Sequence, residues 1–200
     1  MPEFAEAVYT AMNEVCGTAP ERTQWGYVNP NPPYGLLQAD ALEATLPETE
    51  ATEEVDALVD RLRDMVQPFG CLPFFHRTRE ITRDIDSPKQ NKVVVIHAQS
   101  ILEIADVTCL TSAGVNYDID DEMMQDTFAD WDKRFGLTVL EVSNAYLRLR
   151  FRTAPENPKA FLKEIVTFCP TVLEVTETKA EYQKIMQDLQ EHHIPDLWWD

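Results

Sequence analysis

A continuous apolar run, Val93 to Ala98, most limits what this chain can fold into, because it is rich in β-branched residues and is interrupted only by His97. Such a run is typical of a strand that is buried on both faces, whereas a half-exposed strand alternates apolar and polar residues. We therefore expect residues 93–98 to form a strand inside a sheet.

Helix and strand signals follow this run in a regular order. Apolar residues at helical spacing predict a helix over 120–135. Asn157 with Pro158, and a capping box from Thr178 to Glu181, mark the starts of two further helices. Strands are predicted over 137–142, 145–151, 171–175 and 196–200, and a short helical piece over 101–105.

The predicted order is therefore β-α-β-β-α-β, followed by one more helix and strand. The first six elements match the split βαβ pattern of a ferredoxin-like domain, and the last pair adds one strand by a right-handed crossover. The predicted fold class is α+β, with this ferredoxin-like sheet over residues 91–200.

Residues 1–90 are expected to form an acidic, mainly helical region packed on that sheet. Helical spacing predicts helices from Pro2 to about Cys16 and from Thr52 to about Val66. The stretch 23–35, which is rich in proline and aromatic residues, is interpreted as an extended or turn-rich loop. The charged segment 76–92 is interpreted as a loop or irregular strand and as the boundary between the two regions.

The C-terminal stretch IPDLWWD places two tryptophans beside the last residue. Chain ends usually fray, so this pair is either docked into the core or offered to a partner. In a terminal strand, Leu197 and Trp199 would face one side and Trp198 the other. We favour docking, with at least one tryptophan in the core, since tryptophan is usually buried for packing.

Composition restricts the compartment and the chemistry. The longest strongly apolar run has four residues, whereas a membrane-spanning helix needs about 20. Acids stand where a signal peptide has basic residues, and the four cysteines are scattered without a C-x-x-C pair. We expect a cytoplasmic protein with reduced thiols, no membrane contact, no metal and no cofactor.

The net charge of −18 is unevenly distributed, since residues 1–60 hold twelve acids and a single base, Arg22. Nucleic acid and anionic lipid repel such a chain, so no nucleic-acid partner is expected. The charge is interpreted either as a means of staying soluble, which we favour, or as an acidic surface for a basic partner.

Several short motifs in the last hundred residues resemble one bacterial family. These are TSAGVNYDID at 111–120, Trp131-Asp132, Phe-Cys-Pro at 168–170 and the terminal LWWD. Together they are similar to the family of domain of unknown function 4253. The resemblance implies a bacterial or phage origin and no established activity. Members of the family tend to carry an acid after Phe-Cys-Pro, where this chain has Thr171.

The motif NYDIDDE at 116–122 places four acids in five positions at the start of a predicted helix. Clustered carboxylates suit a divalent cation. Acids in a first helical turn also cap free N–H groups and complement the helix dipole, and we favour this interpretation. The motif lacks the glycine and the distal glutamate of a calcium-binding loop.

The connection over 97–122 is the place where an enzyme site would lie, because long loops after strands often carry function. Its candidate residues are His97, Cys109, Asn116, Tyr117, Asp118 and Asp120. A histidine inside an apolar run is more often a satisfied core residue, and no phosphate-binding loop or metalloprotease motif is present in the sequence.

The strand AYLRLRFR at 145–152 places Tyr146, Arg148, Arg150 and Arg152 on one face. An open face of this kind can stack RNA bases. We favour an internal explanation, in which acids of the N-terminal region meet these guanidinium groups.

Two functions from different classes therefore remain. The first, which we favour, is a protein-binding module that acts through an acidic surface as an inhibitor, an immunity protein or an adaptor. Its expected contacts with a basic protein partner are Glu48, Glu50, Glu53 and Glu54. The second is a hydrolase or transferase with its site in the 97–122 connection.

Overall fold

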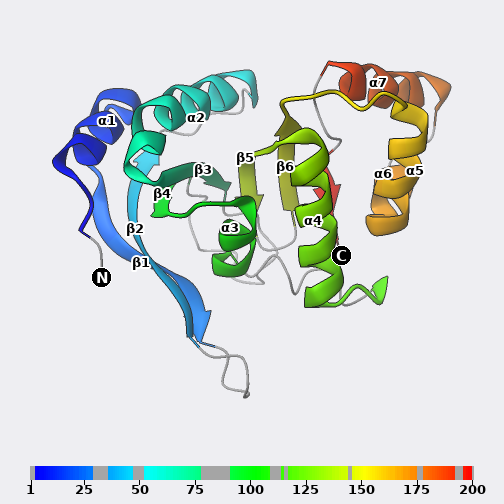
Figure 1. Ribbon diagram of the computed structural model, residues 1–200. Coiled ribbons are helices and arrows are strands. Elements are labelled where there is room, and N and C mark those ends of the chain that lie inside the picture. The colour runs from blue at the N-terminus through cyan, green and yellow to red at the C-terminus, as the bar shows by residue number, and fades with distance from the viewer. Residues whose placement is uncertain are drawn as a thin grey trace, which may run out of the picture. The chain divides into compact units, whose positions relative to one another are not determined.

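The computed structural model describes residues 3–28, 36–46, 52–77, 91–108, 114, 117–143, 146–174, 178–191 and 196–199. These residues combine helices with a mixed sheet, so the predicted α+β class is confirmed at that level. In chain order (Figure 1) the elements are α1 (Glu6–Cys16), β1 (Glu21–Val28), β2 (Leu36–Leu46), α2 (Thr52–Val66), the 3-10 turn η1 (Gln67–Phe69), β3 (Cys71–Arg77), β4 (Asn91–His97), α3 (Ile101–Val107), α4 (Asp121–Phe135), β5 (Leu137–Ser143), β6 (Tyr146–Phe151), α5 (Pro158–Phe168), α6 (Thr171–Glu174), α7 (Lys179–Gln190) and β7 (Leu197–Trp198).

The chain divides into two compact units, which are described separately. Unit 1 comprises Met1–Thr108 with Leu140–Ser143, and unit 2 comprises Cys109–Val139 with Asn144–Asp200. The strands hydrogen-bond in the order β1-β2-β4-β3-β5-β6-β7. The β3–β5 pair is parallel, whereas β1–β2, β2–β4, β3–β4 and β6–β7 are antiparallel.

Strand β4 lies at the centre of unit 1, between β2 and β3. The four side chains from Val93 to Ile96 are fully buried, which confirms the predicted buried strand. Helices α1 and α2 lie side by side (Figure 1) and pack against this part of the sheet. Their apolar stripes supply the core with Val8 and Met12 from α1 and with Val59 and Leu62 from α2.

The prediction for residues 23–35 was wrong in its first part, because Glu21–Val28 form β1. Strands β2 and β3 were not predicted either. Strand β1 was missed because prolines follow it directly in the sequence and because Gly26, at φ 121°, interrupts its strand pattern. Residues 29–35 and 78–90 lie outside the described residues, so the predicted loop over 76–92 is described only at its two ends.

Unit 2 contains most of the helices that were predicted from caps. Asp120 accepts a hydrogen bond from the amide of Met123 at the start of α4, and Gly136 ends that helix at φ 69°. Asn157 accepts one from the amide of Ala160 at the start of α5. The capping box between Thr178 and Glu181 opens α7. These predicted starts are confirmed, and β5 and β6 are neighbours in the sheet, while their connection over 144–145 lies outside the described residues.

Residues 171–175 were predicted to form a strand, and this prediction was wrong. Residues 171–174 form the short helix α6, because the chain turns directly after α5. The amide of Val172 donates to the carbonyl of Cys169 at 3.2 Å, and the amide of Leu173 donates to that of Pro170 at 3.0 Å. Without this strand, the ferredoxin-like order is not confirmed.

The C-terminal tail is docked into unit 2, as predicted. Leu197 and Trp199 are buried, at 0% and 1% exposure, while Trp198 is 39% exposed. The indole of Trp199 donates to the carbonyl of Phe168 at 3.4 Å. The thiol of Cys169 lies 3.2 Å from the carbonyl of Trp198 and 3.3 Å from its amide nitrogen. The Phe-Cys-Pro motif and the terminal motif therefore hold each other in place.

Candidate functional site

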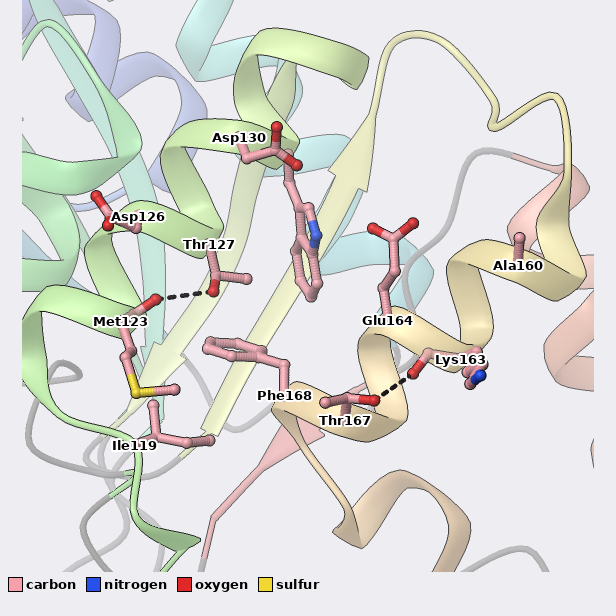
Figure 2. A pocket seen from close by; sticks show the side chains of 11 residues that line it. Ile119, Met123, Asp126, Thr127, Asp130, Ala160, Lys163, Glu164, Thr167 and Phe168 are labelled. Carbon is pink, nitrogen blue, oxygen red and sulfur yellow. Dashed lines mark hydrogen bonds between the residues drawn. The ribbon is translucent and has the colours of Figure 1, made fainter.

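A groove of about 520 Å³ runs between α4 and α5 in unit 2 (Figure 2). Such a volume is within the range of ligand-binding clefts. The groove is built almost entirely from the exposed edges of the two helices. Its lining residues are Ile119, Met123, Asp126, Thr127, Asp130, Trp131, Ala160, Lys163, Glu164, Thr167 and Phe168.

The two walls follow from helical periodicity. On α4, residues three and four positions apart lie on one face, so Met123, Thr127 and Trp131 form one wall. On α5 the same spacing brings Ala160 and Thr167 to the other wall. Most residues of the stripes that bury the helices in the core are offset from these walls by one position, whereas Trp131 and Phe168 belong to both. The sequence therefore encodes both the core face and the groove face of each helix.

One end of the groove is closed by a tight turn. The amide of Ile119 donates to the carbonyl of Gly114 at 3.1 Å. A side chain at Gly114 would place its Cβ only 2.7 Å from Cβ of Ile119, so this close approach requires glycine. The turn delivers the side chain of Ile119, at 5% exposure, to the floor of the groove.

The floor is aromatic and rigid. The ring of Phe168 packs edge-on against Trp131 with centroids 5.2 Å apart, and against Phe128 at 5.5 Å. Trp131 also meets Phe161 at 5.3 Å. Edge-to-face contacts of this kind add about 0.5–1.5 kcal/mol per pair beyond burial. The floor of the groove is therefore a packed aromatic cluster, in which Trp131 is 2% and Phe168 7% exposed.

Arg134 ties the two helices together beside the groove. Its guanidinium donates to both carboxylate oxygens of Glu164, at 2.7 and 3.2 Å, and to Asp130 at 2.8 Å. The hydrogen bonds that Arg134 donates to Glu164 and Asp130 raise its pKa above the usual value for arginine. Two parallel bonds to one carboxylate fix its orientation as well as its charge. The spacing between α4 and α5 is therefore set by this bridge.

The polar groups of the walls are largely satisfied by their own helices. The hydroxyl of Thr127 donates to the carbonyl of Met123 at 2.8 Å, and that of Thr167 donates to the carbonyl of Lys163 at 2.9 Å. In Figure 2 both hydroxyls turn toward their own helices, and the methyl groups turn toward the space between them. The walls are consequently more apolar than the residue types suggest.

The edge of the groove carries one large exposed apolar side chain and one unengaged acid. Met123 is 51% exposed. The carboxylate of Asp126 forms no ion pair or hydrogen bond with any residue the structure describes, whereas Asp130 and Glu164 are held by Arg134. The arrangement can bind an apolar group against Trp131 and a cation beside Asp126. It contains no nucleophile paired with a base.

The acidic motif at 116–122 serves the helix start, as we favoured. Asp120 is the N-cap of α4, and Asp118 takes a left-handed conformation, at φ 58°, in the turn before it. Within the described part of the chain, no group of three or more histidine, cysteine or acidic side chains is placed to hold a metal ion. Asn116 lies outside the described residues, and Tyr117 is half-buried.

His97 has a different neighbour from the one considered in the sequence. Its ring stacks on Phe4 with centroids 4.4 Å apart, and its Nδ1 lies 3.5 Å from the thiol sulfur of Cys71. Burial raises the pKa of Cys71 to about 11, so the thiol stays protonated at neutral pH and is a poor nucleophile. Cys109 lies outside the described residues. His97 therefore packs on Phe4, while its Nε2 is buried without a hydrogen-bond partner among the described residues.

The acids chosen from the sequence for partner binding are only partly described. Glu53 and Glu54 are exposed in the first turn of α2, while Glu48 and Glu50 lie outside the described residues.

The arginine face of β6 is not an open surface at its start. Tyr146 and Arg148 are each 6% exposed, and the Tyr146 hydroxyl donates to Asp196 at 2.6 Å. The expectation that N-terminal acids meet these arginines stays a prediction.

Sequence reasoning missed a polar network in unit 1. The indole of Trp25 donates to Glu43 at 3.1 Å, and Lys92 donates to the same carboxylate at 2.8 Å. The Trp25 ring packs edge-on against His76 at 4.7 Å, and the His76 Nδ1–H donates to the carbonyl of Val142 at 2.9 Å. Burial lowers the pKa of His76. The four side chains come from four strands, and only the strand register could have brought them together.

The groove and the docked tail both lie within a stretch that matches a known family. A family model described as Domain of unknown function (DUF4253) matches residues 92–200. No curated protein and no solved structure matches the chain. The match includes the Asn-Tyr-Asp, Phe-Cys-Pro and terminal tryptophan motifs, so the resemblance seen in the sequence is confirmed. Because the match covers more than half of its residues, the chain belongs to the DUF4253 family.

Proposed function

We propose that this protein is a binding module whose groove between α4 and α5 holds a basic, amphipathic segment of a partner protein. The observation that carries the proposal is the combination of an aromatic floor with the exposed Met123 and the unengaged carboxylate of Asp126. Methionine is over-used at binding surfaces because its flexible, polarizable side chain adapts to different partners. An apolar side chain of the partner would rest against Trp131 and Met123.

Charge supports a basic partner rather than an acidic one. Glu122, Asp126 and Asp130 are exposed and four residues apart, so they form an acidic stripe along α4 beside the groove. The net charge of −18 adds a long-range attraction for cations. Steering of this kind speeds encounter and is screened by salt over about 10 Å at 0.1 M. The exposed acids Glu53 and Glu54 would contribute to it.

Binding is favoured over hydrolysis or group transfer for reasons specific to the candidate residues. His97 packs on Phe4 beside a protonated thiol, and Asp120 is engaged in capping. Neither is presented to a substrate by the contacts described. The groove differs from these residues, because Met123 at its edge is 51% exposed.

A site-specific photocrosslinker tests the proposal. We would replace Met123 with a benzophenone amino acid in the native cell, with Phe69 as the matched control, because Phe69 is also a large exposed apolar residue, at 43% compared with 51%. We expect a partner adduct from position 123 and none from position 69. The crosslinked segment should contain basic residues, and the yield of adduct should fall when crosslinking is repeated in a cell extract at high salt. An acidic segment, or equal adducts at both positions, would contradict the proposal.

A further inference from the structure

A second groove, of about 650 Å³, lies where α6 and α7 meet α5, and it shares Ala160, Lys163 and Thr167 with the groove between α4 and α5. Leu162 and Val166 of α5 form one side, and Leu173 of α6 and Tyr182 of α7 form the other. Leu173 is 41% exposed and Tyr182 is 36% exposed. A patch of large apolar side chains that stays open to solvent is a common mark of a binding surface.

The charge around this groove is opposite to the charge of the chain. Its lining includes Lys159 and Lys163, and no aspartate or glutamate is among the lining residues that the structure describes. The whole chain has 35 acids and 17 lysines and arginines, so an acid-free lining with two lysines runs against its composition. The groove between α4 and α5, by contrast, is lined by three acids and one lysine.

Neither lysine is engaged with another side chain that the structure describes. They lie one helical turn apart on α5, so both amino groups can reach the same anionic group. The adjacent acid on α5, Glu164, does not compete for them, because Arg134 holds both of its carboxylate oxygens. The two ammonium groups are therefore available to a ligand.

We propose that this groove binds a medium-chain alkyl carboxylate, with its tail along Leu162, Val166 and Leu173 and its carboxylate beside Lys159 and Lys163. The volume is within the 300–1,000 Å³ of typical small-molecule clefts, so a single amphiphile fits the groove. Tyr182 flanks the tail with an aromatic face. Its ligand is anionic, unlike the basic segment of the proposed function, and Lys163 lines both grooves.

The test is a calorimetric titration of the full-length protein with sodium dodecanoate, below the concentration at which it forms micelles. Dodecyltrimethylammonium, which has the same tail and a cationic head group, is the matched probe. We expect one equivalent of dodecanoate to bind and the cationic amphiphile to bind at least tenfold more weakly. Equal binding of the two amphiphiles, or no binding of dodecanoate, would overturn the proposal.

Variants locate the binding in this groove. An exposed ion pair changes affinity by up to about fivefold, so the double variant K159Q/K163Q should bind dodecanoate about fivefold or more weakly. Lys184→Gln is the control, because Lys184 already pairs with Asp188 at 3.0 Å. Leu173→Ser should also weaken binding, through loss of apolar contact with the tail. Unchanged affinity in K159Q/K163Q overturns the proposal.

A titration with a peptide distinguishes a groove that binds an amphiphile from one that binds a protein partner. An acidic amphipathic peptide of leucine and glutamate has the charge of a carboxylate but the size of a protein segment. If that peptide binds and depends on Lys159 and Lys163 while dodecanoate does not bind, the groove is a protein interface and the proposal is wrong. If dodecanoate displaces the peptide or binds alone, the proposal stands.

Discussion

The two terminal tryptophans provide a matched pair of substitutions in adjacent positions. Trp199 is 1% exposed, so nearly all of the roughly 200 Å² that a tryptophan can bury is removed from water. At about 25 cal/mol per Å² this burial is worth about 5 kcal/mol, and replacement by alanine typically costs about 3–5 kcal/mol. We therefore expect Trp199→Ala to lower the free energy of unfolding of unit 2 by about 4 kcal/mol.

Trp198→Ala is the control, because the Trp198 side chain is 39% exposed at the edge of the sheet. By the same arithmetic Trp198 buries about three fifths of the area that Trp199 buries, so its replacement should cost about 2–3 kcal/mol. The assay is urea unfolding followed by near-ultraviolet circular dichroism. If the two variants unfold at the same urea concentration, or if Trp198→Ala is the more destabilised, then the tail does not dock through Trp199 and our account of it is refuted.

Three further substitutions test the site and its surroundings. Arg134→Ala should lower the free energy of unfolding by about 0.5–1 kcal/mol in urea, because it removes the partly exposed bridge between α4 and α5, whereas Lys133→Ala, on the exposed face, should cost less than about 0.3 kcal/mol. Burial lowers the pKa of His76 from 6.5, so the unfolded chain takes up this proton first, stability falls as the pH drops below about 6.5, and His76→Gln should remove that part of the pH dependence of unfolding. Gly114→Ala should displace Ile119 from the groove floor, which would appear as methyl shifts of Ile119 in NMR spectra and as a loss of about 1–3 kcal/mol of stability.

The elements that the sequence predicted correctly are those with local signals. Helices α4, α5 and α7 each begin at a capping residue that bonds to its own first turn, so a few neighbouring residues determine their starts. The buried strand β4 was predicted for a similar reason, since its apolar run needs no knowledge of its partners. The docking of Trp199 followed from its chemical type, because so large a side chain rarely stays in water.

The elements that were missed depend on contacts distant in the sequence. Strand β1 has few β-branched residues, and it is stabilised by pairing with β2 and by Trp25 packing on Phe74 and His76. Residues 171–174 were predicted as part of a strand, yet the turn at Pro170 and the contacts of Thr171 with the tail make these residues helical. Tertiary contacts therefore override local preference at these places.

The groove between α4 and α5 could be predicted only in part. Helical periodicity shows which residues share a face, but the pairing of Arg134 with Glu164 joins residues 30 positions apart. The exposure of Met123 also depends on which helix packs beside it. From the sequence, acids of the N-terminal region were predicted to contact a partner, whereas the groove is formed by residues of the family-matched region.

The most direct test of the proposed binding groove is an NMR titration of protein labelled on the methionine methyl groups, of which the chain has six. The ligand is a 16-residue amphipathic peptide of leucine and lysine, and the control peptide has glutamate in place of lysine. We predict a saturable shift of the Met123 signal with the basic peptide, weakened in Asp126→Asn and by 0.5 M salt, and little shift with the acidic one. An unmoved Met123 signal, or equal shifts with both peptides, would contradict the account.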